Sequence, residues 1–146
     1  MSGSVASGTG IAVTGPNGTG KSTLLRVIAG LLKPAGGEVV LAGTDPERPA
    51  AAHIHYVGHL DAVKTQETVG ANMVFWARWL GGDPDADALE DALAAFELDH
   101  LFDLPAAFLS AGQRRRLGLS RLLAAPRAVW LLDEPTVALD ARSESR

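Results

Sequence analysis

The sequence predicts an α/β domain whose parallel sheet is interrupted by an inserted group of helices. Three observations lead to this prediction. Short apolar segments alternate with segments of helical periodicity at both ends of the chain. The last apolar segment, residues 128–132, is almost wholly apolar, as is typical of strands buried on both faces of a parallel sheet. The part of the chain between the two ends contains mainly helical patterns.

The first expected helix is preceded by a polar loop at residues 1–10 and a short apolar run at residues 11–13. Because this run stops at a glycine-rich turn, we expect a buried strand that ends in the turn. Helical spacing starts at residue 21, with one apolar face made by Leu24, Val27, Ile28 and Leu31. We expect this helix to end at Lys33, since the residue before a proline avoids the helical region.

Three more strands and three more helices are expected further along the chain. The strands lie at residues 38–41, 54–57 and 128–132. The helices are expected at residues 68–80, 86–98 and 110–123. Ser110 is a favourable N-cap for the last of these helices.

The length of 146 residues is that of one ordinary domain. No repeat, low-complexity tract or linker divides the chain. We therefore expect a single domain over residues 1–146. Its core is expected to come from residues 11–60 and 126–142, and a helical subdomain from about residue 65 to residue 125.

Composition excludes several classes of function. A hydrophobic fraction of 47% allows a buried core, and a net charge of −4 argues against a basic surface that grips nucleic acid. The absence of cysteine excludes disulfides and thiolate metal sites. No apolar run approaches the ~20 residues that span a bilayer, and the first ten residues lack the features of a signal peptide. We expect a cytosolic protein that reaches a membrane only through a partner.

Residues 15–22 read GPNGTGKS and match the phosphate-binding pattern G-x-x-x-x-G-K-[ST] at every fixed position. The glycines let backbone amides curl around an anion, and the helix that follows points its positive end at that anion. Lys21 can reach the terminal phosphates, and Ser22 can offer its hydroxyl to Mg²⁺. The alternative is an ordinary strand–turn–helix corner, which the combination of a strand before and an amphipathic helix after the loop disfavours.

Two acidic residues, Asp133 and Glu134, follow the last apolar strand. They stand at the carboxyl end of a core strand, where nucleotide sites form in sheets of this kind. Asp133 can hold Mg²⁺ through its water shell, and Glu134 points elsewhere and can polarise an attacking water. The alternative, a pair of exposed acids in a loop, is disfavoured by the phosphate loop upstream.

A second motif of small residues, LSAGQ at residues 109–113, opens the last expected helix. By itself it can be a serine-capped helix start with small residues for close packing. With the phosphate loop before it and the acidic strand end after it, the chain resembles the nucleotide-binding subunits of ATP-binding cassette (ABC) proteins. In that family a signature motif lies just before the acidic strand, and here Ala111 replaces a usual glycine.

The resemblance implies a P-loop NTPase fold and an ABC-type ATPase that uses ATP and Mg²⁺. It implies that Lys21 and Glu134 are catalytic and that Ser22 and Asp133 bind Mg²⁺. The nucleotide would be held by Gly15, Pro16, Asn17, Gly18, Thr19, Gly20, Lys21, Ser22 and Thr23. In this family two cassettes pair head to tail, and the signature helix of one faces the γ-phosphate held by the other. The signature residues would be Ser110, Ala111, Gly112 and Gln113.

Several segments are more narrowly similar to the haem-exporter ATPases of cytochrome c maturation, the A subunits of the Ccm system. They read TGPNGTGKSTLLRVIAGLLKPAGGEV, DLPAAFLSAGQRRRLGLSRLL and WLLDEPTVALDA, and the similarity covers most of residues 11–142. His59 occupies the usual glutamine position of the Gln-loop, and Asp140 lies in the D-loop segment. The resemblance implies a homodimer on the cytoplasmic face of the inner membrane, bound to the integral membrane subunits of the haem exporter and not to nucleic acid.

Two other functions stay open at this stage: a soluble ABC ATPase of DNA repair or translation, and a fragment that binds nucleotide without turnover. Family members also carry an aromatic residue that stacks on adenine before the phosphate loop and a switch histidine after the D-loop. Neither is found in this sequence. We therefore expect a cassette clipped at both ends, with weak nucleotide binding and slow or no ATP turnover.

A few further side chains have simpler expected roles. His53 and His55 are expected to be structural or exposed, since nothing near them completes a set of metal or haem ligands. Trp76 and Trp79 are expected to belong to the core and to a surface that faces a partner, and not to a cofactor site. At least two of the three arginines at residues 114–116 are expected to form a solvated basic helix face.

Overall fold

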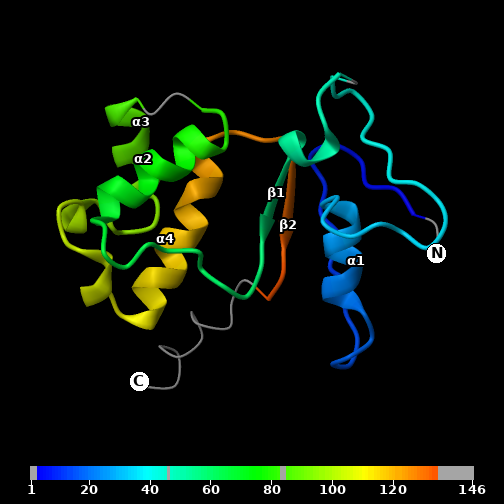
Figure 1. Cartoon of the computed structure of the whole chain (residues 1–146), viewed down its shortest axis with the longest axis horizontal. Helices are drawn as coiled ribbons and strands as arrows, with labels where there is room; N and C mark the ends of the chain where they lie inside the picture. The colour runs from blue at the N-terminus through cyan, green and yellow to red at the C-terminus, as the bar shows by residue number, and fades with distance from the viewer. Residues whose placement is uncertain (1–2, 46, 83–84, 135–146) are drawn as a thin grey trace.

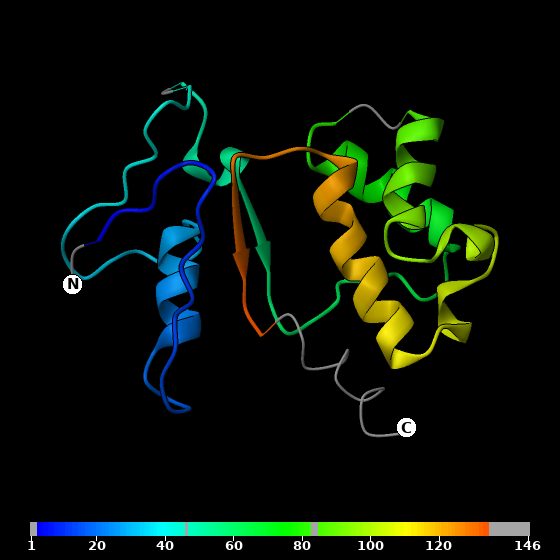
Figure 2. The ribbon, with the colours of Figure 1, turned by 180° about the vertical axis from the view of Figure 1, so that it is seen from behind.

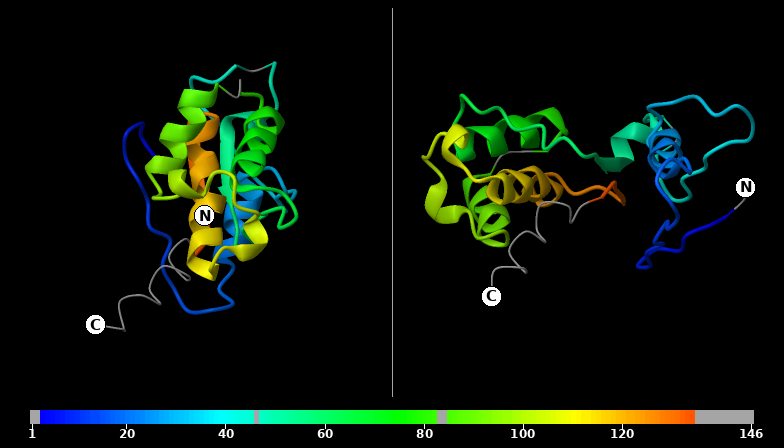
Figure 3. Two further views of the ribbon diagram at one scale, coloured as in Figure 1. Left: turned by 90° about the vertical axis from the view of Figure 1, so that its left-hand side faces the viewer. Right: turned by 90° about the horizontal axis from the view of Figure 1, so that it is seen from below.

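The computed structural model of the protein describes residues 3–45, 47–82 and 85–134. Its α-helices are α1 (Lys21–Ile28), α2 (Val69–Trp79), α3 (Ala86–Ala94) and α4 (Ala111–Ala124). A two-stranded sheet lies in the middle, with α1 on one side and α2, α3 and α4, here called the helical group, on the other (Figures 1 and 2). Seen from below, α1 and the helical group lie at opposite ends of an elongated molecule (Figure 3).

The sheet consists of β1 (Ile54–Val57) and β2 (Val129–Leu132), which run parallel and pair in register from the first residue to the last. Both strands and their parallel direction were predicted and are confirmed. The ladder continues one residue beyond β2, because the Asp133 amide donates to the Val57 carbonyl at 2.8 Å. This bond holds the start of the acidic pair at the carboxyl edge of the sheet.

The strands predicted at residues 11–13 and 38–41 are wrong. Neither segment is extended into a strand, and Ile11 is 62% exposed. An apolar run becomes a strand only where a neighbour completes its hydrogen bonds and another layer covers its side chains. Among the described residues β1 and β2 pair only with each other, so these two segments have no strand to complete them.

Helix α1 ends at Ile28 rather than at the predicted Lys33. Gly30 follows in the left-handed region, with φ 73°, and the Leu31 amide returns to the Arg26 carbonyl at 2.9 Å. This is the glycine-terminated motif that satisfies the last carbonyls of a helix. A glycine just past the helix end therefore stops α1 before the proline does, and Leu31 is exposed instead of facing the core.

The face of α1 that meets the sheet carries Leu25 and Ile28. They pack beside Ile54 of β1 and Leu131 of β2, both of which are buried. Ile28 belongs to the predicted apolar face of the helix and Leu25 does not. This small cluster holds the second half of α1 against the sheet.

The helical group packs around one apolar cluster. The buried residues from its helices are Val69, Met73, Ala77, Leu89, Ala92, Leu93, Leu117 and Ala124. The three from α2 follow each other at intervals of four, which places them on one face of that helix. Each large side chain buried in this way stabilises the fold by about 1.5–3 kcal/mol. The cluster fixes α4 against α2 and α3, and thereby sets the direction in which α4 begins.

The ends of the other helices follow local hydrogen bonds. The Thr68 hydroxyl caps α2 by accepting from the Ala71 amide at 3.1 Å. The helix predicted at residues 86–98 ends at Ala94, because Glu97 turns into the left-handed region with φ 56°. Short 3-10 turns complete the described chain at Ala50–His53, Asp99–Leu101 and Ala106–Phe108.

Within the described ranges, no helix is both long enough and apolar enough to cross a membrane.

Candidate functional site

The loop at residues 15–20 curls tightly before α1. Gly18 and Gly20 adopt φ 82° and 91°, a region that glycine enters without the steric cost of a side chain. The Thr19 hydroxyl donates to the Pro16 carbonyl at 2.9 Å, and the Thr19 amide approaches the same oxygen at 3.4 Å. The loop is exposed, and it leads directly into the amino end of α1.

Lys21, the first residue of α1, folds its side chain back over this loop. Its ammonium group donates to the Gly15 carbonyl at 2.8 Å and to the Pro16 carbonyl at 3.0 Å. The positive charge is therefore held at the loop, beside the amino end of a helix whose dipole also favours anions. Thr23, two residues further on, is exposed.

Ser22 and Asp133 meet although 111 residues separate them in the sequence. The Ser22 hydroxyl donates to Oδ1 of Asp133 at 2.9 Å. Asp133 is only 6% exposed, so its carboxylate depends on hydrogen bonds in place of water. The structure thus brings together the two side chains for which a common metal was expected from the sequence.

Tyr56 supplies the other contact of this carboxylate and was missed by sequence reasoning. Its hydroxyl donates to Oδ2 of Asp133 at 3.2 Å. Arg26 donates through Nε to the Tyr56 oxygen at 3.4 Å, and this hydrogen bond raises the pKa of the Arg26 guanidinium. A signal for Arg26 was available, because it lies four residues after Ser22 and therefore on the same face of α1.

Glu134 follows Asp133 but lies in a different setting. Its side chain is exposed, and its backbone is in the left-handed region with φ 52°. Its carbonyl accepts a hydrogen bond from Arg115 at 3.1 Å. The two acids therefore diverge, as expected, with one buried beside Ser22 and the other open to solvent. Asp140 lies outside the described residues.

The signature residues form the start of α4. Ser110 is the N-cap: its hydroxyl accepts from the Gln113 amide at 3.2 Å, and the Gln113 side chain accepts from the Ser110 amide at 2.8 Å. This reciprocal pair is a capping box. Ser110 and Ala111 are exposed, and Gly112 is half-buried. In Figure 1 this helix start lies across the sheet from α1, so one chain does not bring the signature to its own phosphate loop.

The expectation that at least two of Arg114, Arg115 and Arg116 form a solvated face is wrong. Arg115 is buried, and the other two are half-buried. Arg114 donates to the Leu109 carbonyl, and Arg116 donates to the Glu97 carboxylate at 2.8 Å. Their side chains fold onto nearby carbonyls and acids because α4 runs through the inside of the molecule rather than along its surface.

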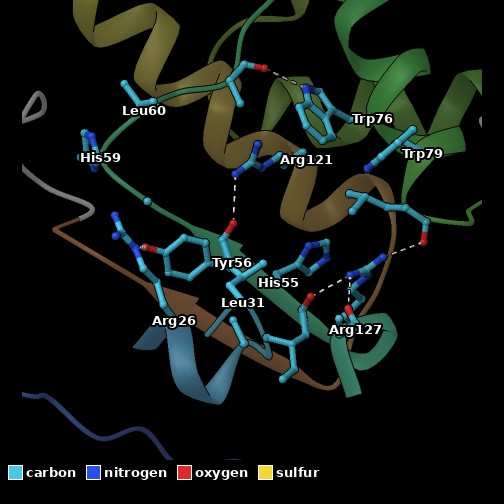
Figure 4. Close-up of a pocket in the computed structure, with 16 residues that line it drawn as sticks. Arg26, Leu31, His55, Tyr56, His59, Leu60, Trp76, Trp79, Arg121 and Arg127 are labelled. Carbon is cyan, nitrogen blue, oxygen red and sulfur yellow. Dashed lines mark hydrogen bonds between the residues drawn. The ribbon is translucent and has the colours of Figure 1, made fainter. Parts of the chain in front are cut away.

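His59 is exposed and lies on the rim of a cavity of about 440 Å³ between the sheet and the helical group (Figure 4). Leu60, Trp76 and Trp79 line the same cavity. Trp76 is half-buried and donates its indole hydrogen to the Ala62 carbonyl at 3.1 Å, whereas Trp79 is exposed. Trp76 therefore belongs to the packed interior and Trp79 to the surface, in agreement with the expectation of a core role and a surface role for these two residues.

Three basic side chains at this cavity are held by backbone carbonyls. Arg121 donates to the Tyr56 carbonyl at 3.2 Å and lies 4.8 Å from the Trp76 ring centre. Arg127 donates to the Ile54 carbonyl at 2.7 Å. His55 is buried with Nε2 2.6 Å from the Ala125 carbonyl, and burial lowers its pKa. These contacts give His55 a structural role, and within the described residues no three or more His, Cys, Asp or Glu side chains cluster as a metal site.

The family model described as ABC transporter matches residues 1–137. The chain belongs to the ABC transporter family. It is 55% identical over 139 residues to the cytochrome c biogenesis ATP-binding export protein CcmA of Nitrobacter winogradskyi, and 56% identical over 138 residues to that of Bradyrhizobium diazoefficiens. These alignments cover 95% and 94% of the chain and 68% of each relative, so the chain spans about two thirds of their length.

Solved structures of ABC proteins have the same fold. A putative ABC transporter ATP-binding protein from Pyrococcus furiosus superposes with a TM-score of 0.77 at 31% identity, over 88% of this chain and 64% of that one. A bacterial Atm1-family ABC exporter with ATP bound superposes with a TM-score of 0.71 at 24% identity, over 88% of this chain and 24% of that one. The predicted α/β fold of an ABC ATPase is therefore confirmed.

Proposed function

We propose that this protein binds ATP with Mg²⁺ and hydrolyses it as the ATP-binding subunit of an export complex for cytochrome c biogenesis. The observation that carries the proposal is the pairing of Ser22 and Asp133, 2.9 Å apart beside a curled phosphate loop. An ordinary strand–turn–helix corner has no need for a buried carboxylate at this place. The loop, Lys21 and the amino end of α1 supply positive charge for phosphates.

The side chains around Asp133 fit Mg²⁺. This ion takes oxygen ligands and is usually held through one or two protein oxygens and the phosphates of the substrate. The Ser22 hydroxyl and the Asp133 carboxylate are such oxygens, and Tyr56 orients the carboxylate from its other side. When bound, Mg²⁺ would neutralise part of the charge on the phosphates.

The remaining roles follow from where the side chains lie. When nucleotide binds, the Lys21 ammonium group would donate to phosphate oxygens in place of the Gly15 and Pro16 carbonyls. This change of partner needs only a local movement of the ammonium group. Gly15 to Thr23 would hold the phosphates through backbone amides and hydroxyls. Glu134, exposed and next to Asp133, would accept the proton of an attacking water.

The signature motif would act in a second copy of the chain. Its capped helix start is exposed and lies away from the phosphate loop of its own chain (Figure 1). A helix start binds anions through its free amides and its dipole. Head-to-tail pairing would bring Ser110, Ala111, Gly112 and Gln113 of one copy to the nucleotide of the other.

The names of the relatives favour export over a soluble role in DNA repair or translation, because both are ATP-binding export proteins of cytochrome c biogenesis. We propose a peripheral subunit at the cytoplasmic face of the inner membrane that works with integral membrane subunits in haem export and not with nucleic acid. Residues 11–60 and 126–142 would form its ATP-binding core, with a helical subdomain over about residues 65–125. His59 and the exposed Trp79 would lie on the side of the membrane partner.

Nucleotide binding is tested by titrating the protein with a fluorescent ATP analogue, with and without Mg²⁺. We expect Mg²⁺ to tighten binding, and Lys21→Ala to weaken it at least ~10-fold, since one charged hydrogen bond contributes about 1.5–3 kcal/mol. Lys33→Ala, an exposed lysine beyond the end of α1, is the matched control and should bind as the unaltered chain does. Equal affinities for Lys21→Ala and Lys33→Ala would contradict the assignment of the loop.

Pairing of two copies is tested by cysteine cross-linking, because the chain has no cysteine of its own. With Ser22→Cys in one copy and Ser110→Cys in another, we expect a cross-linked dimer whose yield rises in saturating ATP. As a control, Ser4→Cys takes the place of Ser110→Cys. Ser4 is an exposed serine in the amino-terminal loop, and this pair should give only a background yield of cross-linked dimer. A yield independent of both ATP and position would refute head-to-tail pairing.

A further inference from the structure

Arg115 is a buried charged side chain to which the proposed function gives no role. It lies on α4 and is 3% exposed. Its Nη1 donates to the Gly58 carbonyl at 2.8 Å and to the Asp61 carboxylate at 3.2 Å. Its Nη2 donates to the Glu134 carbonyl at 3.1 Å and reaches the Asp133 carbonyl at 3.5 Å. One guanidinium therefore contacts both segments that leave the carboxyl edge of the sheet.

Each of these two segments carries a residue of the candidate site. Residues 58–61 follow β1 and include His59, and residues 133–134 follow β2 and include Glu134. A guanidinium is planar, and its donors form a rigid fork that fixes the relative position of the groups it binds. A buried charge persists only where it is paired and hydrogen-bonded, and the contacts of Arg115 meet that condition.

In or next to each of the two segments that Arg115 contacts, one residue has a sparsely populated backbone conformation. Ala62 and Glu134 are in the left-handed region, with φ 54° and 52°, although neither is glycine. Such conformations last only where the surrounding structure enforces them. The bonds from Arg115 to the Glu134 carbonyl and to Asp61, next to Ala62, are part of that enforcement.

The backbone of α4 also lies directly against the first of these segments. A Cβ at Gly118, three residues after Arg115, would come within 2.8 Å of the Asp61 carbonyl oxygen. The absence of a side chain at this position allows the helix to approach closely. Arg115 and Gly118 together therefore form a tight joint between α4 and the segment at residues 58–61.

We propose that Arg115 is a positioning residue for ATP hydrolysis, which fixes the backbone of Glu134 so that its carboxylate stands where it accepts the proton of the attacking water. This inference rests on the proposed function. Arg115 acts through Glu134, because its bond to this residue goes to the main chain and leaves the side chain open to solvent. Its hydrogen bonds to Gly58, Asp61 and Glu134 hold the segments that follow β1 and β2, so we expect its loss to change turnover rather than affinity.

The test compares Arg115→Gln with Arg116→Gln, the same substitution at a neighbouring residue that pairs with Glu97, just after the end of α3. Turnover is measured as phosphate release from ATP, and affinity with a fluorescent ATP analogue and Mg²⁺. We expect Arg115→Gln to lower kcat at least tenfold and to leave the Kd within twofold. Arg116→Gln should leave both within twofold. A kcat for Arg115→Gln within twofold of the unaltered chain, or an equal loss in both variants, would overturn the proposal.

A second comparison separates positioning from a general loss of structure. In a Glu134→Gln background, Arg115→Gln should cause no further fall in turnover, because the group that it positions is already neutral. A further tenfold fall in that background would overturn the proposal. If circular dichroism shows that Arg115→Gln does not fold, Arg115→Lys, which keeps the charge and loses the fork, takes its place with the same expectations.

Hydrogen exchange keeps the failure of this proposal distinct from failure of the proposed function. An unaltered chain that releases no phosphate would refute hydrolysis by this protein. The positioning role of Arg115 would then be tested only by the rates of amide hydrogen exchange. Exchange at residues 58–61 and 133–134 that is at least tenfold faster in Arg115→Gln than in Arg116→Gln would support the positioning role. Equal exchange in the two variants would overturn it.

Discussion

Replacing Glu134 with glutamine is expected to lower the rate of ATP hydrolysis by about 10²–10⁴-fold, the usual contribution of a positioned general base. Glutamine has nearly the same shape as glutamate but cannot accept a proton. The side chain is exposed beside the buried Asp133, so the substitution leaves the Ser22–Asp133 contact in place. Nucleotide affinity should stay within about twofold. Phosphate release and the binding of a fluorescent ATP analogue measure the two effects separately.

The matched control for this prediction is Glu90→Gln. Glu90 is also an exposed glutamate, but it lies on α3 in the helical group, and we expect its substitution to change neither rate nor affinity. A Glu134→Gln protein that hydrolyses ATP as fast as the Glu90→Gln protein would show that another group serves as the base. A parallel loss of binding would instead assign Glu134 to nucleotide affinity.

Leu93→Ala is expected to lower the free energy of unfolding by about 2–5 kcal/mol, as is usual when a buried leucine is truncated. Leu93 is 0% exposed on α3, within the apolar cluster of the helical group. Its loss removes apolar contacts and leaves a cavity that the three helices can fill only in part. Chemical denaturation followed by circular dichroism measures the change.

Leu60→Ala makes the same substitution at a residue that is 71% exposed. It should change the free energy of unfolding by no more than about 0.5 kcal/mol, as surface substitutions usually do. A loss of similar size in both variants would mean that the cluster around Leu93 is not a principal source of stability. Because this cluster also directs the start of α4, Leu93→Ala should weaken ATP-dependent cross-linking at residue 110 as well.

The curled loop at residues 15–20 and the acidic end of β2 could be predicted from the sequence alone. A curled loop depends on the spacing of its glycines and on the helix that follows, both of which are local properties. The meeting of Ser22 and Asp133 was expected from the resemblance to ABC proteins, and not from strand pairing, because residues 11–13 before the loop form no strand beside β2. The serine cap of α4 follows from residues 110–113.

Only the tertiary structure decided which apolar segments are strands and where the polar side chains lie. Residues 11–13 and 54–57 were both predicted to be strands, but only the second segment pairs with another strand. Tyr56 contacts Asp133 from 77 residues away and Arg115 contacts Glu134 from 19 residues away, and nothing local to Tyr56 or Arg115 indicates these contacts. Hydrogen bonds between distant segments depend on register and helix packing. Both of these are set by the burial of side chains from several elements at once.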